Sequence, residues 1–316
     1  MLIKVLDRAS MGFDLSFDAL DSFGKVIVYN STSHEELAER SKDADVLVLN
    51  KVKITKEIIE NSSNLKLVCV FATGYDNIDI AAAKKKGVAV CNVPAYSTDS
   101  VTLFTVANVL SLFSHLTEYK RHVSSGKYSE EKKANALTPV YHEMRGKVWG
   151  IIGFGNIGRA VAKVAEALGA KVIVNKRTRV EDYECVDIDA LCERSDIITV
   201  HCPLNDSTRN LINEDRLRMM KPSVVLVNEA RGAVLDEAAV AKAVKQGKIG
   251  AFGCDVYSVE PFDKKHPYTE IAELDNVCLT PHSAWGAYEA RVRCLDVICN
   301  NIKSFINDEY LNRVDK

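Results

Sequence analysis

Residues 148–170 read V-W-G-I-I-G-F-G-N-I-G-R-A-V-A-K-V-A-E-A-L-G-A, and this stretch decides the fold of the chain. Its first five residues, Val148–Ile152, are mostly apolar, which is typical of a buried parallel strand. After Ile157, apolar side chains recur at helical spacing at Val161, Val164 and Leu168. The sequence therefore predicts a buried strand followed by an amphipathic helix.

The loop between this strand and this helix has the spacing G-x-G-x-x-G. A pyrophosphate is bound by free backbone N–H groups at the N-terminus of a helix. We expect Gly153 to make a tight turn, Gly155 to let the phosphates approach, and Gly158 to let the helix pack on the strand. Together with Asn156 and Ile157, these glycines form the predicted dinucleotide site. The alternative is an ordinary structural turn, which the position between strand and helix disfavours.

Composition limits the classes to which the protein can belong. The chain has 316 residues, 47% of them hydrophobic, which is enough for about two domains with their own cores. Its net charge of −2 and its scattered charges predict no nucleic-acid partner and no membrane partner. With no signal-peptide pattern we expect a cytoplasmic protein. The nine cysteines include no C-x-x-C pair, so we expect small buried hydrophobes, neither disulfides nor metal ligands.

Short apolar strands alternate with helical segments along most of the chain, which predicts parallel sheets covered by helices on both faces. In the first half, the expected strands are residues 2–6, 25–29, 45–49, 65–71 and 88–91. In the second half we expect six strands, residues 148–152, 172–174, 196–200, 224–227, 250–254 and 277–279. A phosphate loop after the first of six strands is typical of a dinucleotide-binding sheet.

Three further segments complete the expected organisation. Residues 98–116 are apolar on more than one side and predict a long buried helix, which either bridges two domains or packs in a subunit interface. Residues 119–141 are polar and turn-rich and predict a surface arm, whereas residues 287–305 predict a helix of the first domain. We therefore expect an α/β protein with two doubly wound parallel-sheet domains. A Rossmann domain, residues 99–285, would be inserted into a smaller flavodoxin-like domain, residues 1–98 and 286–316.

Three charged side chains follow predicted strands in the second half: Arg231, Glu260 and His282. An arginine can hold a carboxylate with two parallel hydrogen bonds, and a histidine can transfer a proton near neutral pH. A glutamate can orient that histidine and favour its charged form. Together the three suit the reduction of an oxo acid. Singly, each has an ordinary alternative: an ion pair on a helix for Arg231, a surface position for Glu260 and a turn for His282.

The chain resembles the D-isomer-specific 2-hydroxyacid dehydrogenase family in several motifs that occur in the same order. These are the glycine loop, H-C-P-L (201–204), N-E-A-R-G (228–232), G-C-D-V-Y-S-V-E-P (253–261) and L-T-P-H-S-A-W (279–285). In the first half, A-T-G-Y-D-N-I-D (72–79) and N-V-P-A-Y-S-T-D-S-V (92–101) resemble that family's substrate loop and hinge. The resemblance covers nearly the whole chain.

The resemblance implies a role for each of these residues. His282 would protonate the substrate oxygen while hydride reaches C2, Arg231 would hold the carbonyl and carboxylate, and Glu260 would pair with His282. The cofactor would be lined by Thr98, Cys202, Pro203, Thr208 and Asp255, the last receiving the nicotinamide carboxamide. The substrate would meet Ala72, the backbone N–H groups of Thr73 and Gly74, and Trp285, for which core packing is the alternative. A homodimer through the second domain and the 98–116 helix is also implied.

The motifs are most similar to those of glycerate dehydrogenases and hydroxypyruvate or glyoxylate reductases. We therefore expect NAD(P)H-dependent reduction of a small 2-oxo acid to the D-2-hydroxy acid. Glu260 argues against formate dehydrogenases, which transfer no proton and carry an amide in that role. A D-lactate or D-2-hydroxyisocaproate type dehydrogenase is the alternative within the family. A non-catalytic dinucleotide-sensing scaffold on the same fold is the alternative outside it.

Two positions depart from the family pattern. Lys176 ends the second strand of the dinucleotide sheet, where NAD-specific members have an acid for the ribose hydroxyls. Lys176, Arg177 and Arg179 would attract a 2'-phosphate, so we expect NADP to be preferred to NAD; the alternative is a solvated basic turn. Glu229 stands where the family usually has a small or apolar residue, and it either faces away from the site or alters the substrate preference.

Overall fold

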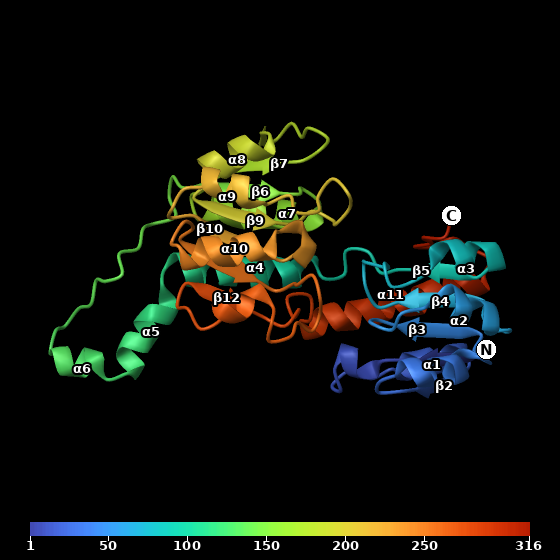
Figure 1. The fold of residues 1–316 in the computed structure, drawn as a ribbon. Helices are drawn as coiled ribbons and strands as arrows, with labels where there is room; N and C mark the ends of the chain where they lie inside the picture. The colour runs from blue at the N-terminus through green and yellow to red at the C-terminus, as the bar shows by residue number, and fades with distance from the viewer. The chain divides into compact units, whose positions relative to one another are not determined.

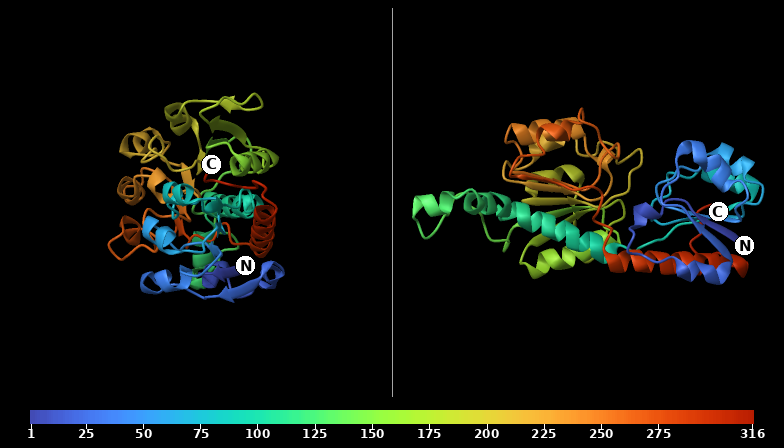
Figure 2. Two further views of the ribbon diagram at one scale, coloured as in Figure 1. Left: turned by 90° about the vertical axis from the view of Figure 1, so that its right-hand side faces the viewer. Right: turned by 90° about the horizontal axis from the view of Figure 1, so that it is seen from below.

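The computed structural model describes all 316 residues, which separate into two compact units. The first unit comprises Met1–Ser97 together with Gly286–Lys316, and the second comprises Thr98–Trp285. Each unit is built around one fully parallel sheet with helices on both faces (Figures 1 and 2). The predicted fold class, two doubly wound α/β units, is therefore confirmed.

The sheet of the first unit has the strand order β2-β1-β3-β4-β5, which is the flavodoxin-like order. Its strands are β1 (Leu2–Val5), β2 (Lys25–Val28), β3 (Val46–Leu49), β4 (Leu67–Val70) and β5 (Ala89–Cys91). The helices are α1 (His34–Ser41), α2 (Lys56–Asn61), α3 (Ile80–Lys86) and α11 (Tyr288–Ile306). The five strands overlap all five expected ones.

Sequence signals set the helix ends in this unit. Ser33 caps α1 in a capping box with Glu36, and Asp79 caps α3, which ends at the left-handed Gly87. Helix α11 returns from the C-terminal part of the chain and packs on β4. In the right-hand view of Figure 2 it is the red helix that runs along the blue strands and helices of the first unit. The expected helix at 287–305 therefore forms and belongs to the first unit.

The sheet of the second unit has the order β8-β7-β6-β9-β10-β11-β12. Its strands are β6 (Val148–Ile152), β7 (Lys171–Asn175), β8 (Glu184–Cys185), β9 (Ile197–Val200), β10 (Val225–Asn228), β11 (Ala251–Cys254) and β12 (Val277–Leu279). The direction of winding reverses between β6 and β9, and open sheets of this kind bind ligands at that point. The expected count of six strands is wrong by one. The seventh, β8, has only two residues and no apolar run.

Two layers of helices cover this sheet. On one face lie α8 (Ile188–Arg194), α9 (Glu214–Met219) and α10 (Glu237–Lys245), and on the other lie α4 (Thr98–Phe113) and α7 (Asn156–Ala167). The cores below them consist mostly of buried apolar side chains, together with some hydrogen-bonded polar groups. One of these is Thr199, which accepts a hydrogen bond from the indole of the buried Trp149 at 3.1 Å.

The segment after α4 differs from expectation. The predicted helix over 98–116 ends at Phe113, and His115, with φ 56°, breaks the helical path. The predicted turn-rich arm over 119–141 begins with two further helices, α5 (Leu116–Ser124) and α6 (Lys127–Glu131). Helix α5 has leucine, glutamate, lysine and arginine in its sequence, which favour helix even where most side chains are polar. No single helix of the structure is long and apolar enough to cross a membrane; α4 and α5 meet that test only together, across a 61° bend.

Candidate functional site

The glycine loop joins β6 to α7 at the point where the sheet reverses. Gly153 has φ +88°, and a Cβ there would lie 2.4 Å from the backbone nitrogen of Cys202. A Cβ on Gly158 would lie 2.3 Å from the carbonyl oxygen of Gly153, so the helix packs directly on the loop. Gly155, the N-cap of α7, faces open space within 4 Å. The three glycines thus make the turn, the opening and the contact that a pyrophosphate site requires.

Asn156 and Ile157 are the first two residues of α7, so their N–H groups belong to the free N-terminal turn of that helix. Such a terminus carries a partial positive charge and suits an anion. The open position at Gly155 and these N–H groups therefore fit the phosphates of a dinucleotide.

The basic cluster lies at the end of β7, the strand beside β6. Lys176, Arg177 and Arg179 are all exposed, and no carboxylate forms an ion pair with any of them. The neighbouring Asn175 instead donates from Nδ2 to the carbonyl of Val186 at 3.0 Å. The end of β7 is therefore positively charged and open to an anionic ligand.

Arg231, Glu260 and His282 follow three adjacent strands, β10, β11 and β12, at one edge of the sheet. His282 Nδ1 lies 2.6 Å from Glu260 Oε2, and about a quarter of each side chain is exposed. Arg231 donates to the carbonyl of its neighbour Ala230 at 2.8 Å. The structure thus pairs the predicted histidine with the predicted glutamate and leaves imidazole Nε2 outside that contact.

Asp255 holds the turn that carries His282. Its buried carboxylate accepts hydrogen bonds from the Thr280 hydroxyl at 2.6 Å and from the N–H groups of Ser283 and Ala284, both at 2.8 Å. The N–H of His282 donates to the Asp255 carbonyl at 2.9 Å, and His282 adopts φ 53°. This left-handed conformation is costly for a residue with a Cβ, so the bonds to Asp255 are what maintain it.

Glu229 is turned into the second unit, toward α4. Its side chain is buried, and Oε1 accepts from Asn108 Nδ2 at 3.2 Å. Strand β10 pairs with β11 in parallel, and Asn228 lies beside Cys254. The next residues of the two chain segments, Glu229 and Asp255, therefore lie beside each other at the ends of neighbouring strands. Burial, and the negative charge of Asp255, raise the pKa of Glu229 to about 8. Glu229 is therefore an uncharged acid at neutral pH.

The other predicted cofactor residues take different positions. Cys202 is buried, and its backbone packs on Gly153 at the reversal point. The Thr208 hydroxyl donates to the Pro203 carbonyl at 2.7 Å and accepts from Asn205 N–H at 2.8 Å, so this hydroxyl closes its own loop. Thr98 begins α4, and Trp285 ends the second unit in a half-buried position.

In the first unit, residues 72–74 form the loop after β4. The Thr73 hydroxyl donates to the Val93 carbonyl at 2.9 Å, and the Thr73 carbonyl accepts from Asn92 Nδ2 at 2.8 Å. The carbonyl of Ala72 accepts from Val93 N–H at 2.9 Å. These bonds fix the loop through hydroxyl and carbonyl groups and do not use the N–H groups of Thr73 and Gly74.

The residues that support the His282–Glu260 pair were not predicted from the sequence. Tyr257 donates from its N–H to Glu260 Oε1 at 3.0 Å and from its hydroxyl to the Thr280 carbonyl at 2.8 Å. Behind it, Glu237 and His266 form a second histidine–carboxylate contact at 3.0 Å. The only signal in the sequence is that Tyr257 stands between two motif residues.

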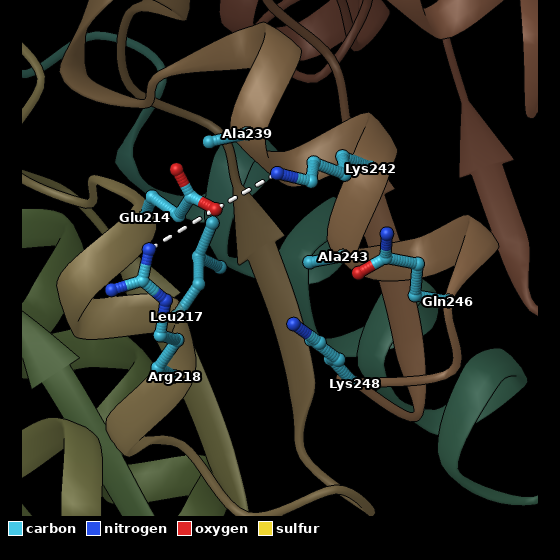
Figure 3. Close-up of a pocket in the computed structure, with 8 residues that line it drawn as sticks. All are labelled: Glu214, Leu217, Arg218, Ala239, Lys242, Ala243, Gln246 and Lys248. Atoms are coloured by element: carbon cyan, nitrogen blue, oxygen red, sulfur yellow. Dashed lines mark hydrogen bonds and ion pairs between the residues drawn. The ribbon is translucent and has the colours of Figure 1, made fainter.

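A hollow between α9 and α10 is shown in Figure 3. Its carboxylate, Glu214, is already paired with Lys242 at 3.0 Å and with Arg218 at 3.2 Å. Both partners of this carboxylate also line the hollow, so the acid is already neutralised there.

Comparison with known proteins agrees with this geometry. Residues 106–284 match the family model described as the D-isomer specific 2-hydroxyacid dehydrogenase, NAD binding domain. The chain is 36% identical to the hydroxypyruvate reductase of Blautia hydrogenotrophica, with 100% of both chains covered.

Two solved structures are similar over almost the whole chain. An acyclic imino acid reductase in complex with NADPH and D-Arg is 32% identical, with a TM-score of 0.86, and the match covers 99% of this chain and 100% of that one. The D-lactate dehydrogenase of Aquifex aeolicus, with NAD and lactic acid, is 28% identical, with a TM-score of 0.87, and the match covers 100% of this chain and 99% of that one. The chain belongs to the D-isomer specific 2-hydroxyacid dehydrogenase family.

Proposed function

We propose that this enzyme reduces a small 2-oxo acid of the glyoxylate or hydroxypyruvate kind to the D-2-hydroxy acid, reversibly, with His282 as the general acid and base. The observation that carries the proposal is the 2.6 Å contact between His282 and Glu260 beside Arg231 at three adjacent strand ends. The similarity to a hydroxypyruvate reductase over the full chain supports this substrate class.

Each residue has a defined task in this reaction. Arg231 binds the substrate carboxylate and carbonyl through its planar guanidinium. A reduced nicotinamide, when bound, supplies hydride to C2. His282 gives its proton to the carbonyl oxygen as negative charge develops there, and it later regains a proton from solvent. Glu260 stabilises the charged imidazolium before transfer, and in the oxidation direction neutral His282 accepts the hydroxyl proton.

The cofactor and substrate loops are assigned in the same way. Residues 153–158 hold the pyrophosphate, and Thr98, Cys202, Pro203, Thr208 and Asp255 line the cofactor. In the first unit, the N–H groups of Thr73 and Gly74 bind a carboxylate next to Ala72. Trp285 shapes the substrate pocket.

A substrate panel tests the proposal. Purified enzyme is assayed by loss of NADPH and NADH absorbance with glyoxylate, hydroxypyruvate, pyruvate and 4-methyl-2-oxopentanoate. We expect the highest kcat/KM with one of the first two. A clear preference for pyruvate or for the branched acid would indicate a D-lactate or D-2-hydroxyisocaproate type dehydrogenase. No turnover with any member would indicate a dinucleotide-sensing scaffold.

We also propose that NADP is preferred to NAD, because Lys176, Arg177 and Arg179 are exposed and unneutralised at the end of β7. Lys176→Asp is expected to lower kcat/KM for NADPH by about tenfold or more, because it repels the 2'-phosphate, while NADH is affected much less. Lys171→Asp, at the other end of the same strand, is the matched control. A wild-type enzyme that prefers NADH would contradict the assignment.

A homodimer through the second unit is part of the same proposal. Exposed apolar side chains gather on α4, on α5 and on the segment after α6, and include Leu103, Leu116, Val123, Leu137 and Val140. Apolar side chains exposed along one continuous part of the chain suit contact with a second copy. Light scattering is expected to give about twice the 34.9 kDa of one chain, and a monomer at micromolar concentration would contradict the proposal.

A further inference from the structure

A buried histidine–carboxylate pair lies behind the loop that carries Glu260. His266 Nε2 is 3.0 Å from Glu237 Oε2, and only 8% and 11% of the two side chains are exposed. Glu237 is the first residue of α10, and His266 caps the short 3-10 helix Pro267–Glu270. A buried carboxylate is costly unless hydrogen bonds satisfy it, so its partners define its role.

The hydrogen bonds determine the form of His266. Its Nδ1 accepts from the N–H of Tyr268 at 3.2 Å, so Nδ1 carries no proton. The proton of the neutral ring is therefore on Nε2, which donates to Glu237. A second proton on Nδ1 would oppose the Tyr268 N–H. Glu237 carries the charge of the pair, at a helix N-terminus that stabilises it.

Glu237 also binds the loop of the catalytic pair. Its Oε1 accepts from the N–H of Ser258 at 2.8 Å, and its Oε2 accepts from the Ser258 hydroxyl. Ser258 is two residues before Glu260. The charge at Glu237 therefore fixes the backbone from which Glu260 reaches His282.

Tyr257 connects this loop to the turn of His282. Its N–H holds Glu260, its hydroxyl holds the Thr280 carbonyl, and its ring lies 6.0 Å from the ring of His266 in edge-to-face geometry. A Cβ on Gly232, next to Arg231, would lie 2.2 Å from the backbone nitrogen of Ser258. The residues that Glu237 anchors are thus in contact with all three catalytic segments.

We propose that Glu237 and His266 are positioning residues, which hold the Ser258–Glu260 loop so that Glu260 stays within hydrogen-bond reach of His282. This inference rests on the proposed roles of Glu260 and His282. Without the two hydrogen bonds from Ser258 to Glu237, the loop becomes more mobile. The hydrogen bond between Glu260 and the His282 imidazole is then less populated. The imidazolium of His282 is then less stabilised, so the enzyme loses its proton donor at a lower pH.

Other titratable groups lie near these loops. Burial raises the pKa of Tyr257, of Tyr268 and of Cys254, so all three stay uncharged across the tested range. Burial also raises the pKa of Glu229, which neighbours Asp255, to about 8, so this group titrates within the range in wild type and in every variant alike. Asp255 faces the turn of His282 and is held by three donors. A purely structural role for Glu237 would lower the melting temperature and leave the pH profile in place.

The test compares Glu237→Ala with Glu260→Gln, with the double variant, and with Glu270→Ala as control. Glu270 is an exposed residue of the same 3-10 helix, paired with Lys245. For each variant, kcat and KM for oxo-acid reduction are measured from pH 6 to pH 10, together with cofactor Kd by fluorescence. Melting temperatures are recorded in parallel. Ser258→Ala, which removes one of the two bonds without touching the core, is measured in case Glu237→Ala folds poorly.

We expect Glu237→Ala to lower kcat about tenfold or more, with cofactor Kd within about twofold, because only the proton donor is affected. The pH at which reduction is half lost moves down, and Glu260→Gln moves it in the same direction. The double variant loses little more than Glu260→Gln alone, since both act through one contact. Ser258→Ala shows the same shift to a smaller extent, and Glu270→Ala shows none.

An unchanged pH profile in Glu237→Ala or, if that variant does not fold, in Ser258→Ala would overturn the inference, as would additive losses in the double variant. If Glu260→Gln itself leaves the profile unchanged, the proposed function fails at its catalytic pair. The two failures are therefore distinguishable.

Discussion

The buried acid Glu229 leads to a prediction about stability. Its carboxyl group is buried between the ends of β10 and β11 and α4, with Asn108 as its hydrogen-bond partner and Asp255 on the neighbouring strand. These surroundings raise its pKa from 4.5 to about 8. The folded protein therefore retains a proton that the unfolded chain releases.

The sign and size of the effect follow from that difference. Between pH 4.5 and pH 8 the unfolded state binds fewer protons at this position, so the free energy of unfolding falls as pH rises. The stabilisation is fully present below pH 4.5 and is lost as pH rises through about 8. One proton corresponds to about 1.4 kcal/mol per pH unit, so about 4 kcal/mol is lost between pH 5 and pH 8. Glu229→Gln keeps the shape and cannot ionise, so it does not show this loss.

Urea unfolding at pH 5, 6, 7, 8 and 9 measures the effect. Both tryptophans, Trp149 and Trp285, belong to the second unit, so their fluorescence reports the unit that contains Glu229. We expect the difference between Glu229→Gln and wild type to grow in favour of the variant by at least about 2 kcal/mol from pH 5 to pH 8. Glu270→Gln is the control, because Lys245 lowers the pKa of that exposed group. A constant difference across the pH range would refute the reasoning.

Two further predictions concern the glycine loop and Arg231. Gly153→Ala is expected to lower stability by a few kcal/mol, because φ is +88° and the Cβ would meet backbone at 2.4 Å. Gly155→Ala is expected to keep the wild-type melting temperature and to weaken cofactor binding about tenfold, because its Cβ occupies only the space open to phosphate; equal thermal shifts in the two variants would contradict this contrast. Arg231→Lys is expected to lower kcat/KM for the oxo acid about 100-fold, since an ammonium cannot form the two-pronged contact, with cofactor Kd unchanged. A similar loss of cofactor affinity in that variant would show that Arg231 acts elsewhere.

Local patterns were enough to predict most of the fold. Apolar runs placed eleven of the twelve strands because most of these strands contribute consecutive buried residues, although β2 is only partly buried. The two-residue β8 has no such run, since pairing with β7 and not burial makes it a strand. Helices α5 and α6 were missed because both are short and their side chains are mostly polar and exposed, as in a turn-rich segment.

In the candidate site, too, features formed by residues close in sequence could be predicted, whereas contacts between distant residues could not. The glycine loop, with Gly153 and Gly155, is recognisable because its chemistry depends on residues close in sequence. Glu237 lies 21 residues before Ser258 and 29 residues before His266 in the sequence, and only the fold of the parallel sheet brings the three together. The raised pKa of Glu229 could not be predicted either, because it depends on burial of the side chain beneath α4.

The most direct test of the account is the rate of NAD(P)H oxidation by wild type and His282→Ala on the best oxo acid, with cofactor Kd measured alongside. We predict that kcat falls by orders of magnitude while Kd stays nearly unchanged, because the proton donor is lost and the glycine loop is intact. The wild-type rate should also fall in alkali as His282 loses its proton. Near-normal turnover in His282→Ala, or a flat wild-type profile to about pH 10, would contradict the account.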